Sequence, residues 1–135
     1  MKEDNMDVKL ILCGHGGFGT GMHGALNLLC GKNEKVQSLD FNEGDSFDDL
    51  VAQMEEIVSA SPSTPTVICT DVQGGSPFKA AVLTKMKHPE IGVIAGTNFP
   101  LLMELMFSSD ATGNLGAQIA IAIESARNSL TSVEI

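Results

Sequence analysis

Apolar residues fall into two patterns that alternate along the chain. Short continuous runs rich in aliphatic residues, which are typical of buried parallel strands, occupy residues 8–13, 36–41, 67–71 and 91–96. Between and after these runs the apolar residues recur at intervals of three and four, which is the spacing of one helix face. The order predicted is therefore strand and helix in alternation.

Five helices are expected from the second pattern. Ser46 with Asp49 resembles a capping box at the start of the second helix. Ser76 and Asn98 have the chemistry of helix N-caps, each with a proline close behind. The apolar stripes are Met22, Ala25, Leu26 and Leu29; Phe47, Leu50, Val51, Met54 and Val58; the runs 78–86 and 97–107; and Leu115, Ile119, Ala122, Ile123 and Ala126.

Strands that alternate with helices predict an α/β protein, because parallel neighbours need crossover helices of this length. We expect a single doubly wound domain over residues 1–135, with a mostly parallel sheet of four strands and helices on both faces. The final segment "TSVEI", residues 131–135, is expected to add a C-terminal edge strand.

Charge and composition narrow the classes of partner. The net charge is −9, with 8 basic against 17 acidic residues, which argues against nucleic acid and favours basic partners. The three cysteines lack metal-ligand spacing, so we expect buried reduced thiols, no metal and no cofactor. No apolar run approaches the roughly 20 residues of a spanning helix. A cytoplasmic protein is expected, with any membrane association made through partner subunits.

The polar residues that could carry chemistry follow the predicted strands. In open α/β sheets ligands bind beyond the carboxyl ends of the strands, where the winding direction reverses. The loops there read "GHGGFGTG", "TDVQGGSPF" and "GTNFP". Aligning "ILCGH" with "VICTD" places Cys13 opposite Cys69 and His15 opposite Asp71, so neighbouring strands would present His15 and Asp71 side by side.

An imidazole beside a carboxylate is a plausible nucleophile. The carboxylate fixes the tautomer and leaves the other ring nitrogen free, which makes His15 a candidate covalent carrier. Helices that begin at Ser76 and Asn98 would point free N–H groups at an anion on that ring. The simpler alternatives are that His15 is a solvated loop residue and that Asp71 caps a turn. His23 and His88 show no partner in the sequence and receive no role.

The glycine-rich loop also supports a dinucleotide site. Gly14, Gly16 and Gly19 follow a strand, and Asp40 ends the next strand as a ribose-binding acid would. A loop with six glycines matches this motif easily by accident, and a chain of 135 residues leaves no room for a catalytic domain. The motif also leaves Asp71 and "GGSPF" unexplained.

Four segments in this order and spacing resemble a known family. "HGGFGTGMHGALNLLCG", "DFNEGDSFDDL", "TDVQGGSPFKAA" and "VIAGTNFPLLMELM" are similar to the IIA domain of the mannose-type family of the bacterial phosphoenolpyruvate-dependent sugar phosphotransferase system. The resemblance runs from about Val8 to about Ala126.

The resemblance implies a phosphohistidine carrier. It would accept a phosphoryl group from HPr and pass it to a IIB component, which phosphorylates the sugar that enters through the membrane permease components. His15 falls on the phosphorylated position and Asp71 on the acid that hydrogen-bonds it. Gly16, Gly75, Ser76 and Asn98 fall on the surrounding loops. The family also implies a homodimer in which a C-terminal strand can cross to the partner.

Two departures from the family concern the surface near His15. The loop after His15 is unusually rich in glycine, and Lys79 stands where an asparagine is common. IIB is expected on a separate polypeptide. A phosphoryl-donor subunit of a dihydroxyacetone kinase and a nucleotide-binding module remain as alternatives.

Overall fold

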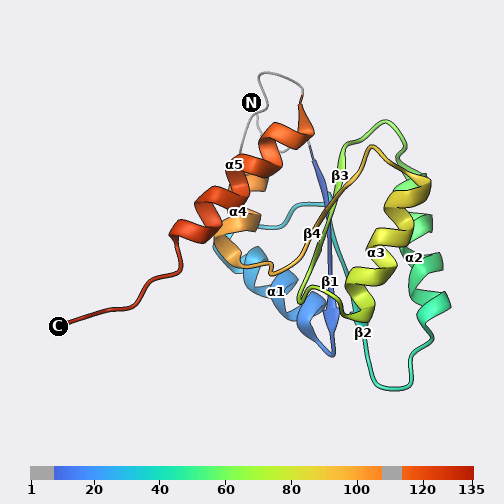
Figure 1. Ribbon diagram of the computed structural model, residues 1–135, viewed down its shortest axis with the longest axis horizontal. Coiled ribbons are helices and arrows are strands. Elements are labelled where there is room, and N and C mark those ends of the chain that lie inside the picture. The colour runs from blue at the N-terminus through green and yellow to red at the C-terminus, as the bar shows by residue number, and fades with distance from the viewer. Residues whose placement is uncertain (1–7, 108–113) are drawn as a thin grey trace.

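A computed structural model describes residues 8–107 and 114–135 of the chain. Its polar N-terminal segment, residues 1–7, lies outside the described residues. Figure 1 shows a central sheet with helices on both faces. The elements are β1 (Lys9–His15), α1 (Phe18–Cys30), β2 (Val36–Phe41), α2 (Phe47–Ala60), β3 (Thr66–Thr70), α3 (Ser76–Lys87), β4 (Gly92–Ile94), α4 (Phe99–Phe107) and α5 (Leu115–Asn128).

The sheet has four parallel strands in the order β2-β1-β3-β4. Helices α2 and α3 cover one face, and α1, α4 and α5 cover the other (Figure 1). The predicted α/β class with a four-stranded parallel sheet is confirmed. The winding direction reverses between β1 and β3, so the site is expected at the carboxyl ends of these two strands.

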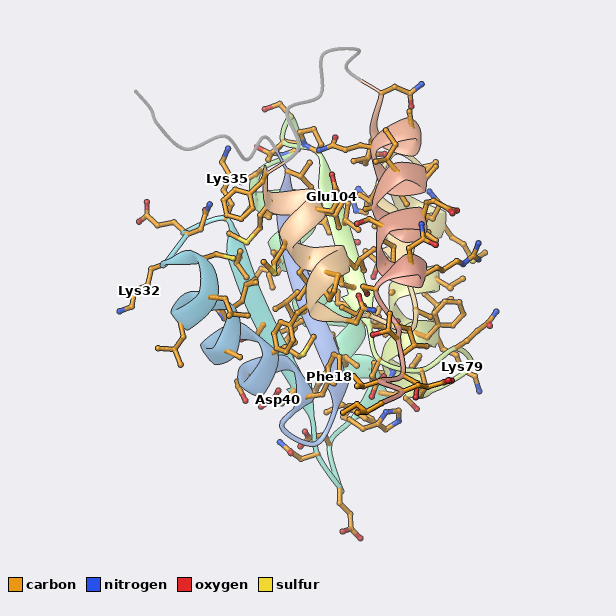
Figure 2. All side chains as sticks on the ribbon, turned by 90° about the vertical axis from the view of Figure 1, so that its left-hand side faces the viewer. Phe18, Lys32, Lys35, Asp40, Lys79 and Glu104 are labelled. Atoms are coloured by element: carbon orange, nitrogen blue, oxygen red, sulfur yellow. The ribbon has the colours of Figure 1, made fainter. Side chains whose placement is uncertain are left out.

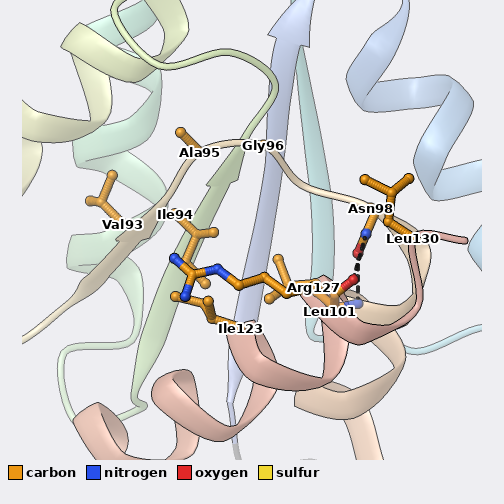
Figure 3. A pocket seen from close by; sticks show the side chains of 10 residues that line it. Val93, Ile94, Ala95, Gly96, Asn98, Leu101, Ile123, Arg127 and Leu130 are labelled. Carbon is orange, nitrogen blue, oxygen red and sulfur yellow. Dashed lines mark hydrogen bonds between the residues drawn. The ribbon is translucent and has the colours of Figure 1, made fainter.

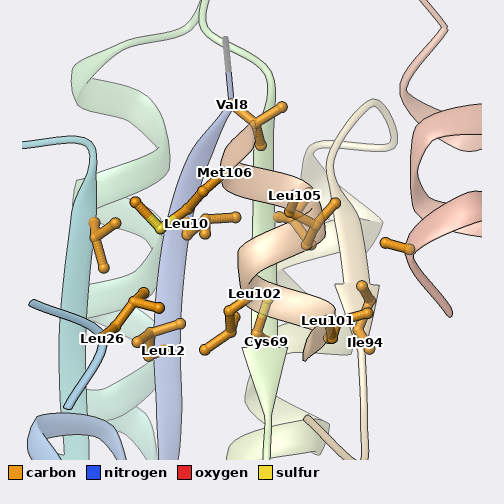
Figure 4. Close-up of a cluster of buried hydrophobic side chains, with 13 residues drawn as sticks. Val8, Leu10, Leu12, Leu26, Cys69, Ile94, Leu101, Leu102, Leu105 and Met106 are labelled. Carbon is orange, nitrogen blue, oxygen red and sulfur yellow. The ribbon is translucent and has the colours of Figure 1, made fainter. Parts of the chain in front are cut away.

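Each face of the sheet has its own core. On one face α4 packs Leu102 and Leu105, both fully buried, over Leu10 and Leu12 of β1 (Figure 4). On the other face Ile11 and its strand neighbours meet α2 and α3. Because both faces are buried, the strands are continuous apolar runs, which is the pattern that predicted them. Among the described residues, no helix is both long and apolar enough to cross a membrane.

Helix boundaries follow the capping chemistry with one correction. Ser46 accepts a hydrogen bond from the backbone N–H of Asp49, so it caps α2 as predicted. Ser76 is not the N-cap of α3. That position is held by Gly75, whose backbone is extended, and Ser76 is already the first helical residue with Pro77 behind it.

The register between β1 and β3 differs by one residue from the prediction. Leu12 pairs with Cys69, and Cys13 pairs with Thr70. Successive side chains of a strand point to opposite faces, so Cys13 and Cys69 lie in different cores instead of opposite one another. The predicted Cys13–Cys69 and His15–Asp71 register pairs were therefore wrong, although His15 and Asp71 still meet.

The expected C-terminal edge strand is absent from the described residues of this single chain. Residues 130–135 have no regular structure, and Figure 1 shows them leading away from the helices. Leu130 and Val133 are 86% and 82% exposed. A short tail cannot offset the entropy of ordering when its apolar side chains find no surface to cover.

Candidate functional site

His15 and Asp71 meet at the carboxyl ends of β1 and β3. His15 is the last residue of β1, and Asp71 directly follows β3. Asp71 Oδ2 lies 2.7 Å from His15 Nδ1 and also accepts the backbone N–H of His15 at 2.8 Å. One carboxylate oxygen therefore fixes both the backbone and the ring of His15.

The carboxylate decides which ring nitrogen is available. An ionised carboxylate only accepts hydrogen bonds, so Nδ1 carries the proton and donates it. Nε2 then keeps its lone pair, and within the described part of the chain it makes no hydrogen bond. The His15 side chain is 51% exposed whereas that of Asp71 is 14% exposed. The pair presents a nucleophilic nitrogen to solvent and shields the group that orients it.

Hydrogen bonds keep Asp71 ionised. Partial burial would raise the pKa of this carboxyl, but the N–H and imidazole of His15 and the N–H of Val72 outweigh burial and lower the pKa. Val72 donates to the second oxygen, Oδ1, at 2.8 Å. Asp71 is therefore a fixed negative charge directly beside the imidazole of His15.

Gly75 lies against the ring of His15. A Cβ built on Gly75 would come within 2.7 Å of His15 Cε1, so only glycine leaves this space free. Helix α3 begins at the next residue, Ser76, and its positive N-terminal end therefore lies beside the imidazole. An anion attached to the ring would meet that helix end.

The loop after His15 is held by β2. Gly16 has a φ of +56°, a left-handed conformation that favours glycine. Its N–H donates to the carbonyl of Phe41 at 2.8 Å. The Phe41 ring lies edge-on to the imidazole with the ring centroids 6.4 Å apart. The Gly16–Phe41 hydrogen bond holds the backbone after His15, and the Phe41 ring packs beside the imidazole.

Asn98 plays a local structural part. Its Oδ1 accepts the N–H of Leu101 at 3.0 Å, which caps α4, and its Nδ2 donates to the carbonyl of Ala126 in α5. These contacts place Asn98 in a pocket of about 380 Å³ between β4, α4 and α5 (Figure 3). Asn98 makes no hydrogen bond with His15 or Asp71 among the described residues, so the structure groups His15, Asp71 and Gly75 more closely than Asn98.

Asp40 bears on the dinucleotide interpretation. Its carboxylate accepts the N–H of Thr20 at 2.9 Å and the Thr20 hydroxyl at 2.7 Å. A carboxylate therefore already occupies the N-terminal turn of α1, where a pyrophosphate would have to bind. Figure 2 shows Asp40 next to Phe18, the first residue of that helix. The geometry disfavours a dinucleotide there.

Phe41 is the site residue that the sequence did not single out. It ends β2 in register with His15, at the same edge of the sheet. Aligning the ends of the first two predicted strands, as was done for the first and third, could have found it. An aromatic residue at the end of an apolar run is typical of a core position, so the sequence alone does not mark Phe41 as part of a site.

Comparison with solved structures supports the fold. The described sheet and helices match the mannose/sorbose-specific IIA subunit from Enterococcus faecalis with a TM-score of 0.85 at 21% identity, covering 96% of this chain and 97% of that one. An EIIA component from Streptococcus agalactiae matches with a TM-score of 0.83 at 24% identity, covering 93% of this chain and 96% of that one. At such identities these likenesses show the fold.

Sequence relatives are more specific. The sorbose-specific EIIA component of Klebsiella pneumoniae is 35% identical over 99 residues, which cover 73% of each chain. The mannose-specific EIIAB component of Escherichia coli K12 is 26% identical over 130 residues; these are 96% of this chain and 40% of that protein. A family model described as the PTS system fructose IIA component matches residues 9–123. The chain therefore belongs to the mannose-type family of IIA components of the sugar phosphotransferase system.

Proposed function

We propose that this protein carries a phosphoryl group on Nε2 of His15, received from HPr and passed to a IIB component. The observation that supports this proposal best is the 2.7 Å contact between Asp71 Oδ2 and His15 Nδ1, which leaves Nε2 as the free nucleophile. Family membership supplies the general role of a sugar phosphotransferase component.

The transfer exchanges one phosphorus–nitrogen bond for another. The lone pair of His15 Nε2 attacks the phosphorus of the donor phosphohistidine in line, and the bond from phosphorus to the donor nitrogen breaks. The electron pair of that bond returns to the donor imidazole. His15 keeps its Nδ1 proton and becomes a positive phosphoimidazole, whose charge Asp71 stabilises. In the second transfer, a nucleophile of IIB attacks the phosphorus, the bond from phosphorus to His15 Nε2 breaks, and its electron pair returns to the His15 ring.

Four residues around His15 have supporting roles in the proposal. Gly75 leaves room for the ring, and Gly16 turns the chain away from it. Ser76 opens α3, whose first N–H groups stabilise charge on the equatorial phosphoryl oxygens. Asn98 acts at a distance, because it fixes the start of α4 and its junction with α5.

The surroundings follow from this role. The relatives and the family model named above are described as components for sorbose, mannose and fructose. We propose a sugar of this kind as the final acceptor, bound by other subunits. The protein works in the cytoplasm and reaches the membrane through its partners. It forms a homodimer in which residues 131–135 pair with the partner subunit.

The experiment is phosphorylation by phosphoenolpyruvate, enzyme I and HPr. The wild type is expected to take up an acid-labile, base-stable label, and His15→Ala to take up none. His23→Ala is the matched control, because His23 lies on α1 and contacts Ser38 instead of the site. Absence of label on folded wild type contradicts the proposal. Transfer of the label to a dihydroxyacetone kinase instead of IIB would favour that alternative.

A further inference from the structure

The phosphoryl group of the proposed carrier would lie close to a negative side chain. A phosphorylated side chain carries about −1.5 to −2 charges near pH 7, and the hydrogen-bonded carboxyl of Asp71 beside the ring is itself ionised. The start of α3 contributes only the partial charge of a helix end, about half an elementary charge. A side-chain cation within reach of His15 Nε2 would supply the positive charge that these groups lack.

Most basic side chains of the described residues lie away from His15, which ends β1 at the carboxyl edge of the sheet. Some lie where strands begin, at the opposite edge; some lie in the last turn of α3; and one lines the pocket on the other face of the sheet. In that order these are Lys9, Lys32 and Lys35; Lys85 and Lys87; and Arg127. The basic residue at the beginning of α3 is Lys79.

Lys79 lies one helical turn beyond Gly75, the residue that touches the imidazole. A Cβ built on Gly75 would come within 2.7 Å of His15 Cε1 and 3.3 Å of His15 Nε2. The N–H of Lys79 donates to the carbonyl of Gly75 at 2.9 Å, so helical spacing already holds between them. Residues four apart share a helix face, and helical side chains lean toward the N-terminus. The Lys79 side chain therefore leaves α3 on the side of His15 and leans toward it.

The Lys79 side chain is long enough to reach a group on Nε2. Cβ atoms four residues apart are about 5–6 Å from one another, which places Nε2 within roughly 10 Å of Lys79 Cβ. The ammonium stands on a flexible four-carbon stem, and Gly75 puts no side chain in its way. A charge-assisted hydrogen bond of about 2.7–2.9 Å to a phosphoryl oxygen closes the remaining gap. Figure 2 shows Lys79 toward the same end of the molecule as Phe18, which begins α1 after the His15 loop.

No described residue holds the Lys79 ammonium elsewhere. The side chain is exposed and, within the described part of the chain, makes no ion pair and no side-chain hydrogen bond. Its neighbours are apolar, since it lines a pocket together with Phe47 and Val82. Lys85 differs, because its ammonium donates to backbone carbonyls beyond the end of α3. The Lys79 ammonium is therefore available to an anion on His15.

We infer that Lys79 is a catalytic residue of the proposed transfer, whose ammonium donates a hydrogen bond to an oxygen of the phosphoryl group on His15 Nε2. The inference rests on the proposed function and adds a residue to its site. As the bond from phosphorus to the donor nitrogen breaks and the bond to Nε2 forms, Lys79 keeps all its protons and only stabilises the oxygens. Asp71 stabilises the positive ring, and Lys79 stabilises the negative group attached to it.

The test uses a small donor, so that binding of a partner protein does not enter the rate. Phosphoramidate transfers its phosphoryl group to Nε2 and releases ammonia, and the label found on His15→Ala is subtracted as background. Lys79→Gln keeps the side-chain length and removes the charge, and Lys87→Gln makes the same change at the other end of α3. Labelling of Lys79→Gln is expected to be about tenfold slower than that of wild type, whereas Lys79→Arg and Lys87→Gln stay within about threefold.

The phosphorylated protein gives a second measurement that a merely structural role would not change. A nearby cation favours the more negative form of the phosphoryl group and so lowers its pKa. Titration followed by ³¹P NMR is therefore expected to give a higher phosphoryl pKa in Lys79→Gln than in wild type. Lys79→Arg is expected to restore the wild-type value, since the charge is kept.

The outcomes separate this inference from the carrier role. Equal labelling rates and equal phosphoryl pKa values in Lys79→Gln and wild type overturn the inference and leave the carrier role intact. Slower transfer from phosphorylated HPr but not from phosphoramidate makes Lys79 a partner contact and also overturns it. An equal loss in Lys87→Gln overturns it as well, because the effect would then be one of overall charge. Absence of label from phosphorylated HPr on wild type contradicts the carrier role, and phosphoramidate still tests Lys79 on His15 directly.

Discussion

Asp71 binds His15 through a single oxygen, Oδ2, which accepts from both the ring and the backbone N–H. The sequence predicted this pair because His15 and Asp71 lie at or just after the ends of two predicted strands. The alignment that suggested it was shifted by one residue, and the aspartate side chain spans that shift. The predicted contact between His15 and Asp71 was therefore correct although the predicted backbone register was wrong, because the aspartate side chain is long enough to reach the imidazole.

Replacing Asp71 by asparagine tests the orienting role. The neutral amide keeps the size of the side chain and removes the charge that stabilises a positive imidazole. Hydrogen bonds to charged groups contribute about 1.5–3 kcal/mol, so phosphoryl transfer is expected to slow roughly 10- to 100-fold in Asp71→Asn. Stopped-flow transfer from phosphorylated HPr measures it. An unchanged rate would show that the carboxylate does not orient the ring.

The same carboxylate gives a pH dependence of stability. The pKa of Asp71 is lowered, so its hydrogen bonds stabilise the fold fully above the unfolded-state pKa and are lost as the pH falls through the lower folded-state pKa. Urea unfolding is expected to show wild type more stable than Asp71→Asn at about pH 6, with the difference shrinking as the pH falls below the unfolded-state pKa. A difference that persists in acid would point to packing instead of charge.

Gly75→Ala tests the space beside the ring. The added methyl would meet His15 Cε1 at 2.7 Å, and the half-exposed ring can turn away more easily than the backbone can shift. We expect a change in unfolding free energy below about 1 kcal/mol, since the backbone of Gly75 suits alanine, but a loss of transfer of about tenfold or more as the Nδ1–Asp71 contact breaks. The ring ¹⁵N shifts of His15 report the displacement.

Gly24→Ala is the matched control for that variant. A Cβ at Gly24, on the exposed side of α1, meets nothing within 4 Å. Alanine is the better helix former by about 0.5–1 kcal/mol, so this variant is expected to unfold at higher urea concentration and to transfer at the wild-type rate.

At the scale of elements, the hydrophobic pattern predicted the four strands and five helices of the described residues, because each helix buries an apolar stripe and the strands lie between two cores. The further strand predicted at residues 131–135 is absent. Boundaries were less certain. Helix α1 begins at Phe18, four residues before the first periodic position, since a glycine-rich turn carries few apolar markers. Strand β4 keeps only Gly92–Ile94 of its predicted six residues. Gly96 has a φ of +79°, and the N–H groups of Gly96 and Thr97 donate to the carbonyls of Asp71 and Thr70 outside the ladder that β4 forms with β3.

Helices α2 and α3 are joined by a hydrogen bond between a histidine and a carboxylate that the sequence did not show. His88, at the C-cap of α3, places Nε2 2.8 Å from Glu55 Oε2 of α2. Residues 33 positions apart gave no local pattern to link them. Hydrogen bonds from His88 and then Ser59 lower the pKa of Glu55. His88, assigned no role from the sequence, thus joins two helices.

Glu55→Gln is expected to destabilise the fold by less than about 1 kcal/mol near pH 6, as partly exposed ion pairs do. Because the pKa of Glu55 is lowered, this contribution is present above the unfolded-state pKa and disappears as the pH falls through the folded-state value. Glu56→Gln, at the exposed neighbouring position, is the control. Equal urea midpoints for the two variants near pH 6 would contradict the pair's contribution.

At the scale of the whole molecule, the strand order explains why the site lies where it does. Alternating strands and helices predicted the α/β class, but no local pattern states which strands are neighbours. The chain winds from β1 to β2 in one direction and then from β2 past β1 to β3 in the other. The connections that follow β1 and β3 therefore lead away from each other, which leaves the carboxyl ends of both strands uncovered. The sequence pattern predicted an edge strand at residues 131–135 and the family resemblance implied that it can cross to a partner, but in this single chain the tail pairs with no strand of the described residues.

The proposed homodimer makes a prediction at this scale. Residues 130–135 leave the domain beside the pocket between β4 and α5, and β4 is an edge strand. Light scattering of the wild type is expected to give twice the chain mass of 14.2 kDa. Deleting residues 131–135 should shift the mass to that of one chain at micromolar concentration, whereas a stable dimer of the shortened chain would exclude the tail as its connection.

The open position of His15 limits how long a phosphoryl group can be stored. Its side chain is half exposed, so in the proposed relay water reaches the phosphorus–nitrogen bond as freely as a partner protein does. This openness is what allows two different proteins to use the same nitrogen in turn. The half-life of the isolated phosphoprotein in buffer is therefore set by hydrolysis, and the partner, when it docks, provides the dry enclosure that this surface lacks.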